Sequence, residues 1–367
     1  MVGARPNFMK IAPIMQALAH SNLLEGYLVH TGQHYDQAMK HSFFDQLGIP
    51  EPHVDLEVGS GSHAVQTAEI MKRFEPVLDQ QRPDAVLVVG DVNSTIACGL
   101  VAVKKHIPLV HVESGLRSGD RSMPEEINRV LTDQISDLLF TTERQARDNL
   151  LAEGIAPERI HFVGNVMIDT LRNNLERAVD PAQTLQAHPR ATAWLEQGFA
   201  LLTLHRPSNV DDPQVLRGLL DTIVAIAAEL PVIFPVHPRT RKQIDGFGLA
   251  PLLGEARVLQ LPPLEYLSLL GLMARARVVF TDSGGIQEET TALGVPCITL
   301  RENTERPITV EEGTNTVVGT DPRVIRAAFE AVMAGKGKGG RIPEFWDGKA
   351  AERIVACLES WFGERHG

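Results

Sequence analysis

The chain has 367 residues and a formal net charge of -11, with hydrophobic residues at 43% and charged residues at 22%. At about 150 residues per domain this length predicts two domains, and the composition is ordinary for a folded globular protein. The acidic balance lacks the long-range basic field of a nucleic-acid-binding protein. An anionic ligand would therefore need locally placed Arg, His and backbone N–H groups. No run reaches the roughly 18 apolar residues of a membrane span, so we expect no membrane association.

Cysteine usage argues against two kinds of site. Cys98, Cys297 and Cys357 are scattered and form no CxxC pair. Neither a disulfide framework nor a zinc cluster is indicated. We therefore expect no metal site, and we expect a protein of the reducing cytoplasm.

Short apolar runs recur along the chain, each followed by a polar segment of helical period. The runs are Ala85–Gly90, Pro108–Val112, Leu138–Thr142, Ile160–Val163, Ala200–Leu204, Pro231–Val236, Val258–Leu261, Val278–Thr281 and Cys297–Leu300. Apolar strands without polar alternation are buried on both faces, which is typical of parallel sheets covered by helices. Two such series predict an α/β protein with two Rossmann-like, doubly wound domains.

Composition shifts indicate the domain boundaries. Arg172–Trp194 is polar and poor in strand signals, and Gly335–Gly340 reads GKGKGG. The second stretch lacks the GxxxxGK[ST] pattern of a phosphate loop, so we interpret it as a flexible connector. The predicted parts are an N-terminal domain over 1–172, a C-terminal domain over 173–348 and a terminal helix over 349–367. The start, MVGARPNFMK, reads as the end of a strand entering a helix, so we expect a shortened first strand.

Polar residues collect directly after the apolar runs. In open α/β sheets ligands bind beyond the carboxyl ends of the strands, so these positions are the candidates for a site. They are Arg5, Asn7, Lys10, Asp91, Glu113, Ser114, Arg117, His205, Arg206, His237, Arg239 and Asp282–Gly285.

The segment Asp282–Glu289, DSGGIQEE, joins a strand end to a helix start through two glycines. Glycines allow close backbone approach, and the first N–H groups of a helix can bind phosphate. An ordinary Ser N-cap in a tight turn explains the pattern equally well. Glu288 and Glu289 could be first-turn partners of the helix dipole or could hold a ribose diol. No GxGxxG follows a predicted strand, which argues against a nicotinamide cofactor.

Three carboxylates form a second candidate cluster: Asp91, Glu113 and Glu125. Carboxylates that converge raise one another's proton affinity, which suits general acid/base catalysis. Singly, each has an ordinary interpretation. Asp91 could cap the next helix, and Glu125 or Glu126 could be a solvated partner of Arg129.

Two histidines follow strands in the second half, His205 and His237. This pair offers too few ligands for a metal. Beside their neighbouring arginines they are better interpreted as anion ligands.

Nine motifs occur in an order that is similar to that of the non-hydrolysing UDP-N-acetylglucosamine 2-epimerases of bacteria. They are GARPNFMKIAP, TGQHYD, GDVNST, HVESGLRSGD, PEEINR, LHRPSNVD, PVHPR, TDSGGIQEE and RENTERPITVEEGTN. The resemblance extends from Gly3 to about Gly319. It implies the GT-B arrangement of two Rossmann-like domains, with the active site in the interdomain cleft and the terminal helix packed on the first domain.

The resemblance also implies a reaction without a cofactor. The family eliminates UDP across carbons 1 and 2 of the sugar, holds 2-acetamidoglucal, and adds UDP back with protonation from the other face. The product is UDP-N-acetylmannosamine. Such chemistry needs a base, an acid and a site for the leaving-group charge.

The family motifs assign residues to these roles. Asp91, Glu113 and Glu125 become the acid/base carboxylates, His205 a functional histidine, and Arg129 the residue that orients Glu125. The implied UDP-sugar ligands are Arg5, Lys10, Arg129, His237, Ser283, Gly284, Gly285 and Glu289. With His237, a further set matches positions that bind a second UDP-sugar as activator in some members: Gln33, His34, Gln37 and Arg206.

Departures from the family pattern leave alternatives open. Ala4, Asn7, Pro207 and Ser208 replace residues of the motifs GTRPE and HRRE that the family often carries. The carboxylates are intact, so the reaction class remains our expectation, whereas activator binding and the exact sugar stay open. Alternatives are a 2-epimerase of UDP-2,3-diacetamido-2,3-dideoxyglucuronate, a GT-B glycosyltransferase, a hydrolysing epimerase and a non-catalytic binding protein. The resemblance also implies a homodimer.

Overall fold

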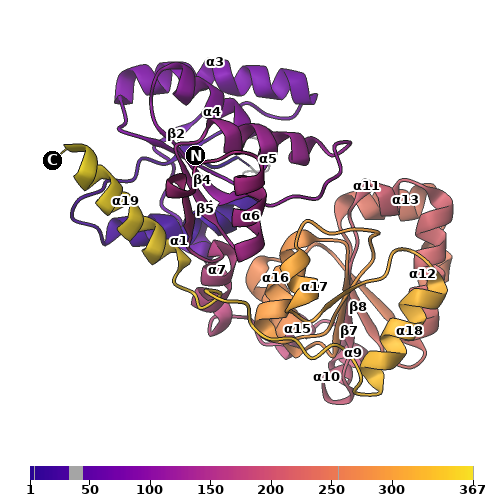
Figure 1. Ribbon diagram of the computed structural model, residues 1–367. Coiled ribbons are helices and arrows are strands. Elements are labelled where there is room, and N and C mark those ends of the chain that lie inside the picture. Colours follow the sequence, from indigo (N-terminus) through magenta and orange to yellow (C-terminus); the bar gives the residue numbers. More distant parts are fainter. Residues whose placement is uncertain (4, 33–43, 255, 367) are drawn as a thin grey trace. The chain divides into compact units, whose positions relative to one another are not determined.

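The computed structural model describes residues 1–3, 5–32, 44–254 and 256–366, which form two compact units (Figure 1). Unit 1 comprises Met1–Asn173 and Glu344–Gly367, and unit 2 comprises Asn174–Pro343. Both are built on parallel sheets, so the predicted α/β class is confirmed. Among the described residues, no helix is both long and apolar enough to cross a membrane.

Unit 1 is built on a four-stranded parallel sheet in the order β3-β4-β5-β6. Its strands are β3 (Val86–Val89), β4 (Leu109–Ser114), β5 (Leu138–Thr141) and β6 (Ile160–Phe162), all within or overlapping the predicted runs. A separate parallel pair joins β1 (Val29–His30) to β2 (Val54–Asp55). The helices are α1 (Arg5–Ala19), α3 (His63–Gln81), α4 (Asn93–Lys104), α5 (Pro124–Ile135), α6 (Arg144–Ala152) and α7 (Val166–Leu175), with a 3₁₀ turn η1 (Pro157–Arg159).

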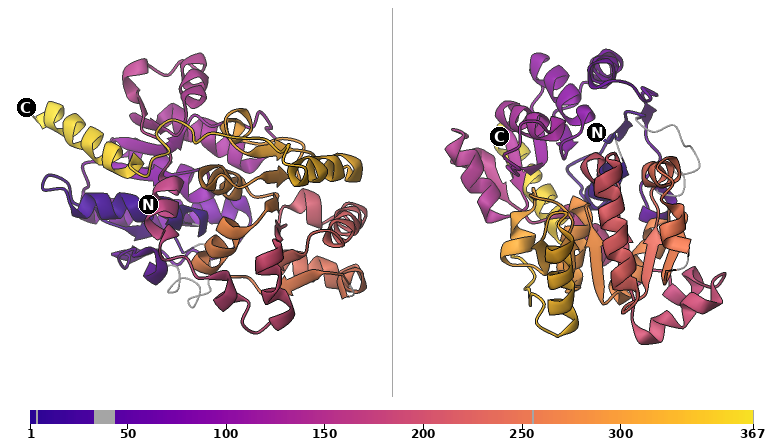
Figure 2. Two further views of the ribbon diagram at one scale, coloured as in Figure 1. Left: turned by 90° about the horizontal axis from the view of Figure 1, so that it is seen from below. Right: turned by 90° about the vertical axis from the view of Figure 1, so that its right-hand side faces the viewer.

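The terminal helix α19 (Ala350–His366) belongs to unit 1 and packs against α1 (Figure 2). The Asp169 carboxylate accepts hydrogen bonds from the backbone N–H groups of Ala350 and Ala351, at 3.1 and 2.7 Å. Just before the helix, the fully buried Trp346 donates its indole N–H to the Thr142 carbonyl oxygen at 3.2 Å. These contacts fix the entry of the chain into α19.

A cavity of about 730 Å³ lies at the amino end of β3, beside the chain start. Val2 pairs in parallel with His30, and the Met1 amino group donates to the Leu87 carbonyl oxygen at 2.9 Å. Apolar side chains such as Ile14, Phe74 and others from α1 and α3 line the cavity. Ligand sites of α/β sheets lie at the opposite, carboxyl ends of the strands, so this cavity is not the candidate active site.

Unit 2 contains a six-stranded parallel sheet in the order β12-β11-β10-β7-β8-β9. Its strands are β7 (Ala200–Thr203), β8 (Val232–Pro235), β9 (Val258–Leu261), β10 (Val278–Thr281), β11 (Cys297–Thr299) and β12 (Asn315–Val317). The chain starts in the middle, moves outward through β8 and β9, and returns to add β10 on the other side of β7. This is the doubly wound order, and its topological switch point lies between β7 and β10.

Helices cover the sheet of unit 2, and several begin with a proline at the first helical position. At that position a backbone N–H would make no intrahelical hydrogen bond, so proline, which lacks the N–H, costs nothing there. In α12, for example, Asp212 precedes Pro213, and its side chain accepts hydrogen bonds from the N–H groups of Gln214 and Val215. The helices are α8 (Pro181–Thr184), α9 (Pro189–Thr192), α10 (Trp194–Gln197), α11 (Pro207–Val210), α12 (Pro213–Ala227), α13 (Pro238–Gly246), α14 (Ala250–Gly254), α15 (Tyr266–Arg275), α16 (Gly284–Leu293), α17 (Pro307–Glu311) and α18 (Pro322–Met333).

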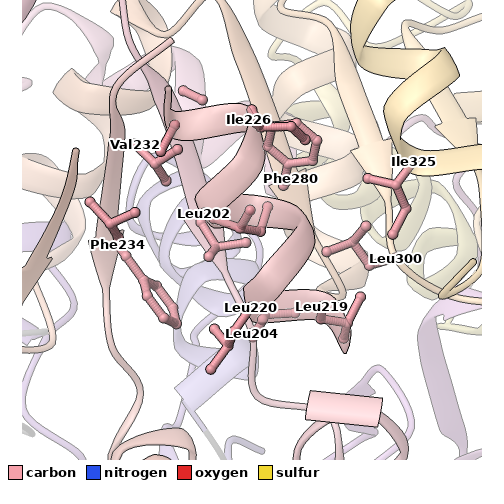
Figure 3. Packing of buried hydrophobic residues seen from close by; sticks show 14 of the residues in the cluster. Leu202, Leu204, Leu219, Leu220, Ile226, Val232, Phe234, Phe280, Leu300 and Ile325 are labelled. Atoms are coloured by element: carbon pink, nitrogen blue, oxygen red, sulfur yellow. The ribbon is translucent and has the colours of Figure 1, made fainter. Parts of the chain in front are cut away.

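The core of unit 2 is formed by strand residues packed against α12 and α18. Leu202 and Phe234 from the sheet meet Leu220 of α12, and Phe280 packs near Phe329 of α18 (Figure 3). All of these side chains are fully buried. The well-packed sheet gives a rigid base to the loops at its carboxyl edge.

Candidate active site

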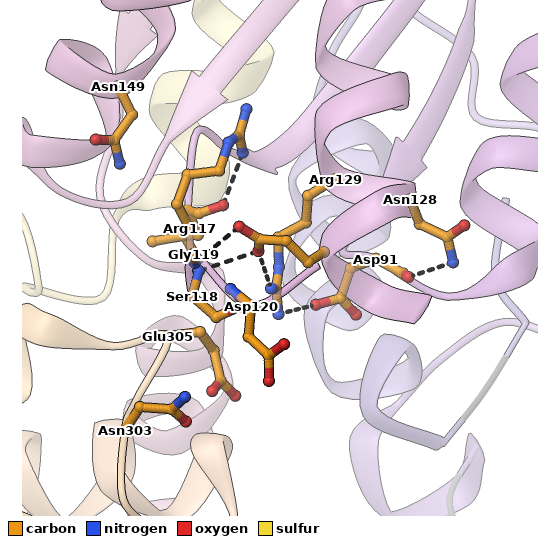
Figure 4. A network of polar contacts seen from close by, with 12 residues as sticks. Asp91, Arg117, Ser118, Gly119, Asp120, Asn128, Arg129, Asn149, Asn303 and Glu305 are labelled. Carbon is orange, nitrogen blue, oxygen red and sulfur yellow. Dashed lines mark hydrogen bonds and ion pairs between the residues drawn. The ribbon is translucent and has the colours of Figure 1, made fainter. Parts of the chain in front are cut away.

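Asp91 and Arg129 form an ion pair at the carboxyl end of β3 (Figure 4). The distance from Arg129 Nη2 to Asp91 Oδ2 is 2.6 Å, and the Asp91 side chain is 18% exposed. Asn128 donates to the Asp91 backbone carbonyl at 2.9 Å. The N-cap of α4 is Val92, without a side-chain hydrogen bond, so the interpretation of Asp91 as a helix cap is wrong. The carboxylate is held by α5 instead.

Glu113 and Lys10 form a second ion pair, at the end of β4. Lys10 Nζ lies 2.5 Å from Glu113 Oε2, and both side chains are buried. Lys10 reaches this position over Gly90, where a Cβ atom would lie 2.9 Å from the ammonium nitrogen. A carboxylate beside an ammonium group is favoured in its ionised form. The sequence placed both residues among the site candidates, and the structure brings them together.

The backbone of Glu113 is left-handed, with φ at 71°. A non-glycine residue in this region costs on the order of 1–3 kcal/mol, and such strain is concentrated at functional sites. Gly115 follows with φ at 78°, and a Cβ atom there would lie 2.3 Å from the Ala146 carbonyl oxygen. The turn after β4 therefore requires glycine at 115, and the irregular end of β4 holds Glu113 in a costly conformation.

Glu126, one of the two residues expected to be a solvated partner of Arg129, does pair with Arg129, but it is buried. Its carboxylate accepts from the N–H groups of Ser118 and Gly119, each at 3.0 Å, and from Arg129 Nη1 at 2.9 Å (Figure 4). Burial by itself would raise the pKa of Glu126, but these donors lower it below its ordinary value. We expected Arg129 to orient Glu125. Arg129 instead pairs with Asp91 and Glu126, while Glu125 is half-buried in the first turn of α5.

A fully buried pair that the sequence did not single out lies behind these residues. His111 Nδ1 is 2.6 Å from Asp133 Oδ1, and His111 Nε2 is 2.9 Å from the Gly90 carbonyl oxygen. Asp133 also accepts from Gly115 N at 3.0 Å and from Arg117 Nη2 at 2.7 Å. No local sequence pattern predicts this pair, because its two residues are 22 positions apart in the chain.

In unit 2, the loop after β7 is tied to the loop after β10, at the topological switch point. Asp282 is fully buried and accepts from His205 Nδ1 at 2.9 Å, from the backbone N–H groups of His205 and Arg206, and from Asn209. Burial raises the pKa of Asp282, but the His205 ring and the backbone donors outweigh it and lower the pKa below its usual value. The ring of His237 lies 5.6 Å from that of His205. The two predicted histidines therefore lie together.

The N-terminus of α16 follows Ser283, whose side chain makes no capping hydrogen bond. Ser283 thus occupies the predicted N-cap position, but without the side-chain hydrogen bond of an ordinary serine cap. A Cβ atom on Gly284 would lie 2.7 Å from Glu305 Oε1. Glu305 is buried and is held by Arg301 at 2.8 Å and by Arg206 at 3.5 Å. A side chain at residue 284 would therefore have to displace the ion-paired Glu305 carboxylate.

Glu288 and Glu289 lie one turn further along α16 and are both buried. The first turn of α16 contains no acidic residue, so their interpretation as first-turn dipole partners is wrong. Glu288 Oε1 lies 2.9 Å from Arg306 Nε, and Glu289 accepts from the Tyr266 hydroxyl at 2.9 Å. The pKa of Glu289 is raised to about 7, chiefly by burial. The Tyr266 hydrogen bond lowers this pKa, and the negative charge of Glu288 raises it further.

Several predicted residues lie outside this description. Gln33, His34 and Gln37 are not among the described residues, and Arg5 is described as the first residue of α1 without its side chain. Of the suggested activator positions, Arg206 and His237 are described, both in unit 2. Across the described part of the chain, no group of three or more His, Cys, Asp or Glu side chains could hold a metal ion.

Comparison with known proteins gives consistent matches over the chain. Residues 16–359 match the family model described as UDP-N-acetylglucosamine 2-epimerase. The UDP-N-acetylglucosamine 2-epimerase of Methanocaldococcus jannaschii is 42% identical, with 98% of this chain and 97% of the relative covered. The UDP-2,3-diacetamido-2,3-dideoxy-D-glucuronate 2-epimerase of Pseudomonas aeruginosa is 41% identical, with 98% of each chain covered. The solved structure of the M. jannaschii enzyme with UDP-GlcNAc and UDP has a TM-score of 0.86 at 41% identity, covering 97% of this chain and 98% of that one.

Proposed function

Because the chain belongs to the UDP-N-acetylglucosamine 2-epimerase family, we propose that it interconverts UDP-N-acetylglucosamine and UDP-N-acetylmannosamine by inverting carbon 2. The observation that carries this proposal is the 42% identity to an enzyme of that name over 98% of the chain. The fold by itself would not fix the chemistry, since many reactions occur on two Rossmann-like domains.

The proposed reaction is an elimination followed by an addition. The hydrogen on carbon 2 is not adjacent to a carbonyl group, so its simple removal and return is too costly. Removing this proton while the bond from carbon 1 to the UDP oxygen breaks gives 2-acetamidoglucal and UDP. Adding UDP back to carbon 1, with a proton delivered to the other face of carbon 2, gives the epimer. No oxidation or reduction occurs in either step.

Unit 1 would carry the proton transfers. Asp91 and Glu113 each have a cationic partner, Arg129 and Lys10, which favours the ionised carboxylate that a base requires. Inversion needs proton removal on one face and delivery on the other, so more than one acid/base group is required. We assign these roles to Asp91, Glu113 and Glu125.

Unit 2 would hold the nucleotide and stabilise the charge of the departing diphosphate. The start of α16, at Ser283, Gly284 and Gly285, offers backbone N–H groups and the positive end of the helix dipole. His205 is paired with Asp282, the residue before Ser283, and would supply a hydrogen-bond donor near the switch point. Glu289 would accept from the ribose hydroxyls. Electrostatic stabilisation of this kind often contributes more to catalysis than any other single effect.

A second substrate is favoured by a specific observation. The 2-epimerase of UDP-2,3-diacetamido-2,3-dideoxy-D-glucuronate from P. aeruginosa is 41% identical, close to the value for the M. jannaschii enzyme. The inversion at carbon 2 would be the same. The two sugars differ at carbon 3 and in the carboxylate at carbon 6, which would require its own cationic partner.

The test is to incubate the protein separately with both UDP-sugars and follow the proton NMR spectrum. A new manno anomeric signal with UDP still attached, from UDP-N-acetylglucosamine, is the expected result. Conversion of the diacetamido uronate alone would assign the second substrate. Free UDP with free N-acetylmannosamine would indicate a hydrolysing epimerase, and no change with either sugar would contradict the proposal.

Three finer properties complete the proposal: a homodimer, a cytoplasmic location and a second UDP-sugar as activator. They rest on the family resemblance, and the activator also on the placement of His237 beside His205. Light scattering would test the dimer. The activator is tested by starting from UDP-N-acetylmannosamine and adding a trace of UDP-N-acetylglucosamine. A shortened lag is expected, and an unchanged progress curve would exclude activation.

A further inference from the structure

The buried residues His111 and Asp133 are hydrogen-bonded to each other and to backbone groups of two turns. Both side chains are fully buried. The Gly90 carbonyl oxygen can only accept, so His111 Nε2 carries a hydrogen. Burial raises the pKa of Asp133, but His111 and Arg117 lower it below the ordinary value. His111 Nδ1 lies 2.6 Å from Asp133 Oδ1, so the ring is hydrogen-bonded through both nitrogens.

The pair connects the turns that carry two of the proposed catalytic carboxylates. Through His111 it binds the carbonyl oxygen of Gly90, the residue before Asp91. Through Asp133 it binds the N–H of Gly115, two residues after Glu113. One side-chain pair is thus hydrogen-bonded to the backbone beside both carboxylates.

The turn at Glu113 has a strained backbone, because Glu113 is not a glycine. Gly90, Glu113 and Gly115 all have positive φ, at 67°, 71° and 78°. The register between β4 and β5 also shifts between Val112 and Ser114. A strained turn persists only where its surroundings determine it. The hydrogen bonds of Asp133 and His111 supply such surroundings from α5 and β4.

We propose that His111 and Asp133 are positioning residues that fix the carboxylates of Asp91 and Glu113 relative to each other. This inference rests on the proposed function, because it assigns the pair a role in that reaction. The two residues do not touch the substrate; they act through Gly90 and Gly115. A displacement of about 1 Å at reacting groups can cost about 100-fold in rate, so loss of the pair is expected to lower kcat strongly.

Two substitutions at one position separate positioning from charge. Asp133→Ala removes the acceptors for Gly115 N and His111, and we expect kcat to fall by about 100-fold. Asp133→Asn can keep the geometry. Its amide oxygen accepts from Gly115 and Arg117, and its amide nitrogen donates to Nδ1 of a neutral His111, which leaves the Nε2 hydrogen for Gly90. We expect Asp133→Asn to retain most of the wild-type kcat.

Asp137→Ala is the matched control. Asp137 also accepts a backbone N–H of β4, that of Leu109 at 2.9 Å, but at the other end of the strand. We expect this variant to lower the melting temperature and leave kcat unchanged. Binding of UDP, measured by calorimetry, should be the same in all three variants and the wild type. A purely structural role of Asp133 would lower the melting temperature, as in Asp137→Ala, and leave the kcat of the folded protein unchanged.

The outcomes separate this inference from the proposed function. If the wild type epimerises neither UDP-sugar, both are wrong. If the wild type is active and a folded Asp133→Ala has the wild-type kcat, the proposed function stands and the positioning role is wrong. If Asp133→Ala does not fold, His111→Gln replaces it, because one amide cannot reach both Gly90 and Asp133. A kcat of His111→Gln equal to that of Asp133→Asn would then overturn the inference.

Discussion

At the scale of single residues, the carboxylates of unit 1 differ in their surroundings. Glu113 and Asp91 each form an ion pair with one cationic side chain, whereas Glu126 is bound by two backbone N–H groups and Arg129. Glu126 therefore has the contacts of a structural residue that orders residues 118–119 and fixes Arg129. A cationic partner favours the ionised carboxylate that a base requires.

Substituting the acid/base carboxylates should remove catalysis and spare the fold. Asp91→Asn, Glu113→Gln and Glu125→Gln are each expected to lower kcat by about 100-fold or more, the range found for acid/base groups. Initial rates and circular dichroism check this. The control is Glu158→Gln, an exposed carboxylate of the same unit, with unchanged turnover. Near-normal activity in all three variants would end the proposed mechanism.

The Tyr266–Glu289 contact predicts a pH dependence of nucleotide binding. The pKa of Glu289 is raised to about 7, chiefly by burial, and the Tyr266 hydrogen bond lowers it. An acceptor for ribose hydroxyls is most effective when ionised, so affinity for UDP should rise as pH increases through about 7. Tyr266→Phe removes the lowering contact and should move this rise to higher pH.

The contribution of Glu289 to folding stability changes with pH in the opposite direction to the UDP affinity. The carboxyl of Glu289 has its ordinary pKa of 4.5 in the unfolded chain and a pKa of about 7 in the folded one. Between these values the folded state holds the extra proton, so this group's contribution to stability is largest below pH 4.5 and is lost as pH rises toward 7. Glu289→Gln should flatten that slope. Calorimetric titrations and melting curves across this range measure both effects, and a pH-independent UDP affinity would refute the assignment of Glu289.

At the scale of elements, α16 carries constraints at both ends. Its start follows Ser283 without a side-chain cap, and its end is closed by Gly294 in a left-handed conformation with φ at 71°. A glycine at this end is the usual way to terminate a helix. The two ends therefore use glycine for different reasons: packing beside Glu305 at the start and backbone conformation at the end.

Alanine substitutions at the two ends of α16 should have separable effects. Gly284→Ala places a methyl group against the buried, ion-paired Glu305, so it should displace the proposed phosphate-binding turn and weaken UDP binding. Gly294→Ala meets no atom within 4 Å, and its strained φ should cost about 1 kcal/mol of stability without affecting UDP binding. Calorimetry with UDP and thermal melting compare them. Equal UDP affinity in both variants would count against a nucleotide site at this helix start.

At the scale of the whole molecule, the chain forms unit 1 from two separate segments. The returning segment, Glu344–Gly367, includes Trp346 and α19. Burial of this segment ties the C-terminus to the unit that holds the carboxylates.

Removing the Trp346 side chain should destabilise unit 1 selectively. Trp346 is 1% exposed, and Trp346→Ala is expected to cost about 3–5 kcal/mol. Trp361→Ala, on the same segment but half-buried, is the control and should cost less. Added UDP should still stabilise the variant, since we place the nucleotide in unit 2. A melting curve for Trp346→Ala as high as that of Trp361→Ala would contradict this.

The sequence predicted the strands well and the contacts of the site poorly. Every apolar run became a strand. The short strands β1, β2 and β12 read VH, VD and NTV, so each contains a polar residue and gives no apolar run. Asp91 and Glu113 were located because they follow strands. Contacts between distant residues were not predicted. Arg129 pairs with Asp91 across 38 residues, and His111 pairs with Asp133 across 22. Such contacts depend on how α5 packs, which no local pattern encodes.

The most direct test of the central claim is the fate of the hydrogen on carbon 2 in heavy water. UDP-N-acetylglucosamine is incubated with the wild type and with Glu113→Gln, and both isomers are analysed by proton NMR. We predict deuterium at carbon 2 of the manno product, with UDP attached, in the wild type and not in the variant. Epimerisation with the original hydrogen retained at carbon 2 would contradict proton removal by a carboxylate and exchange with solvent.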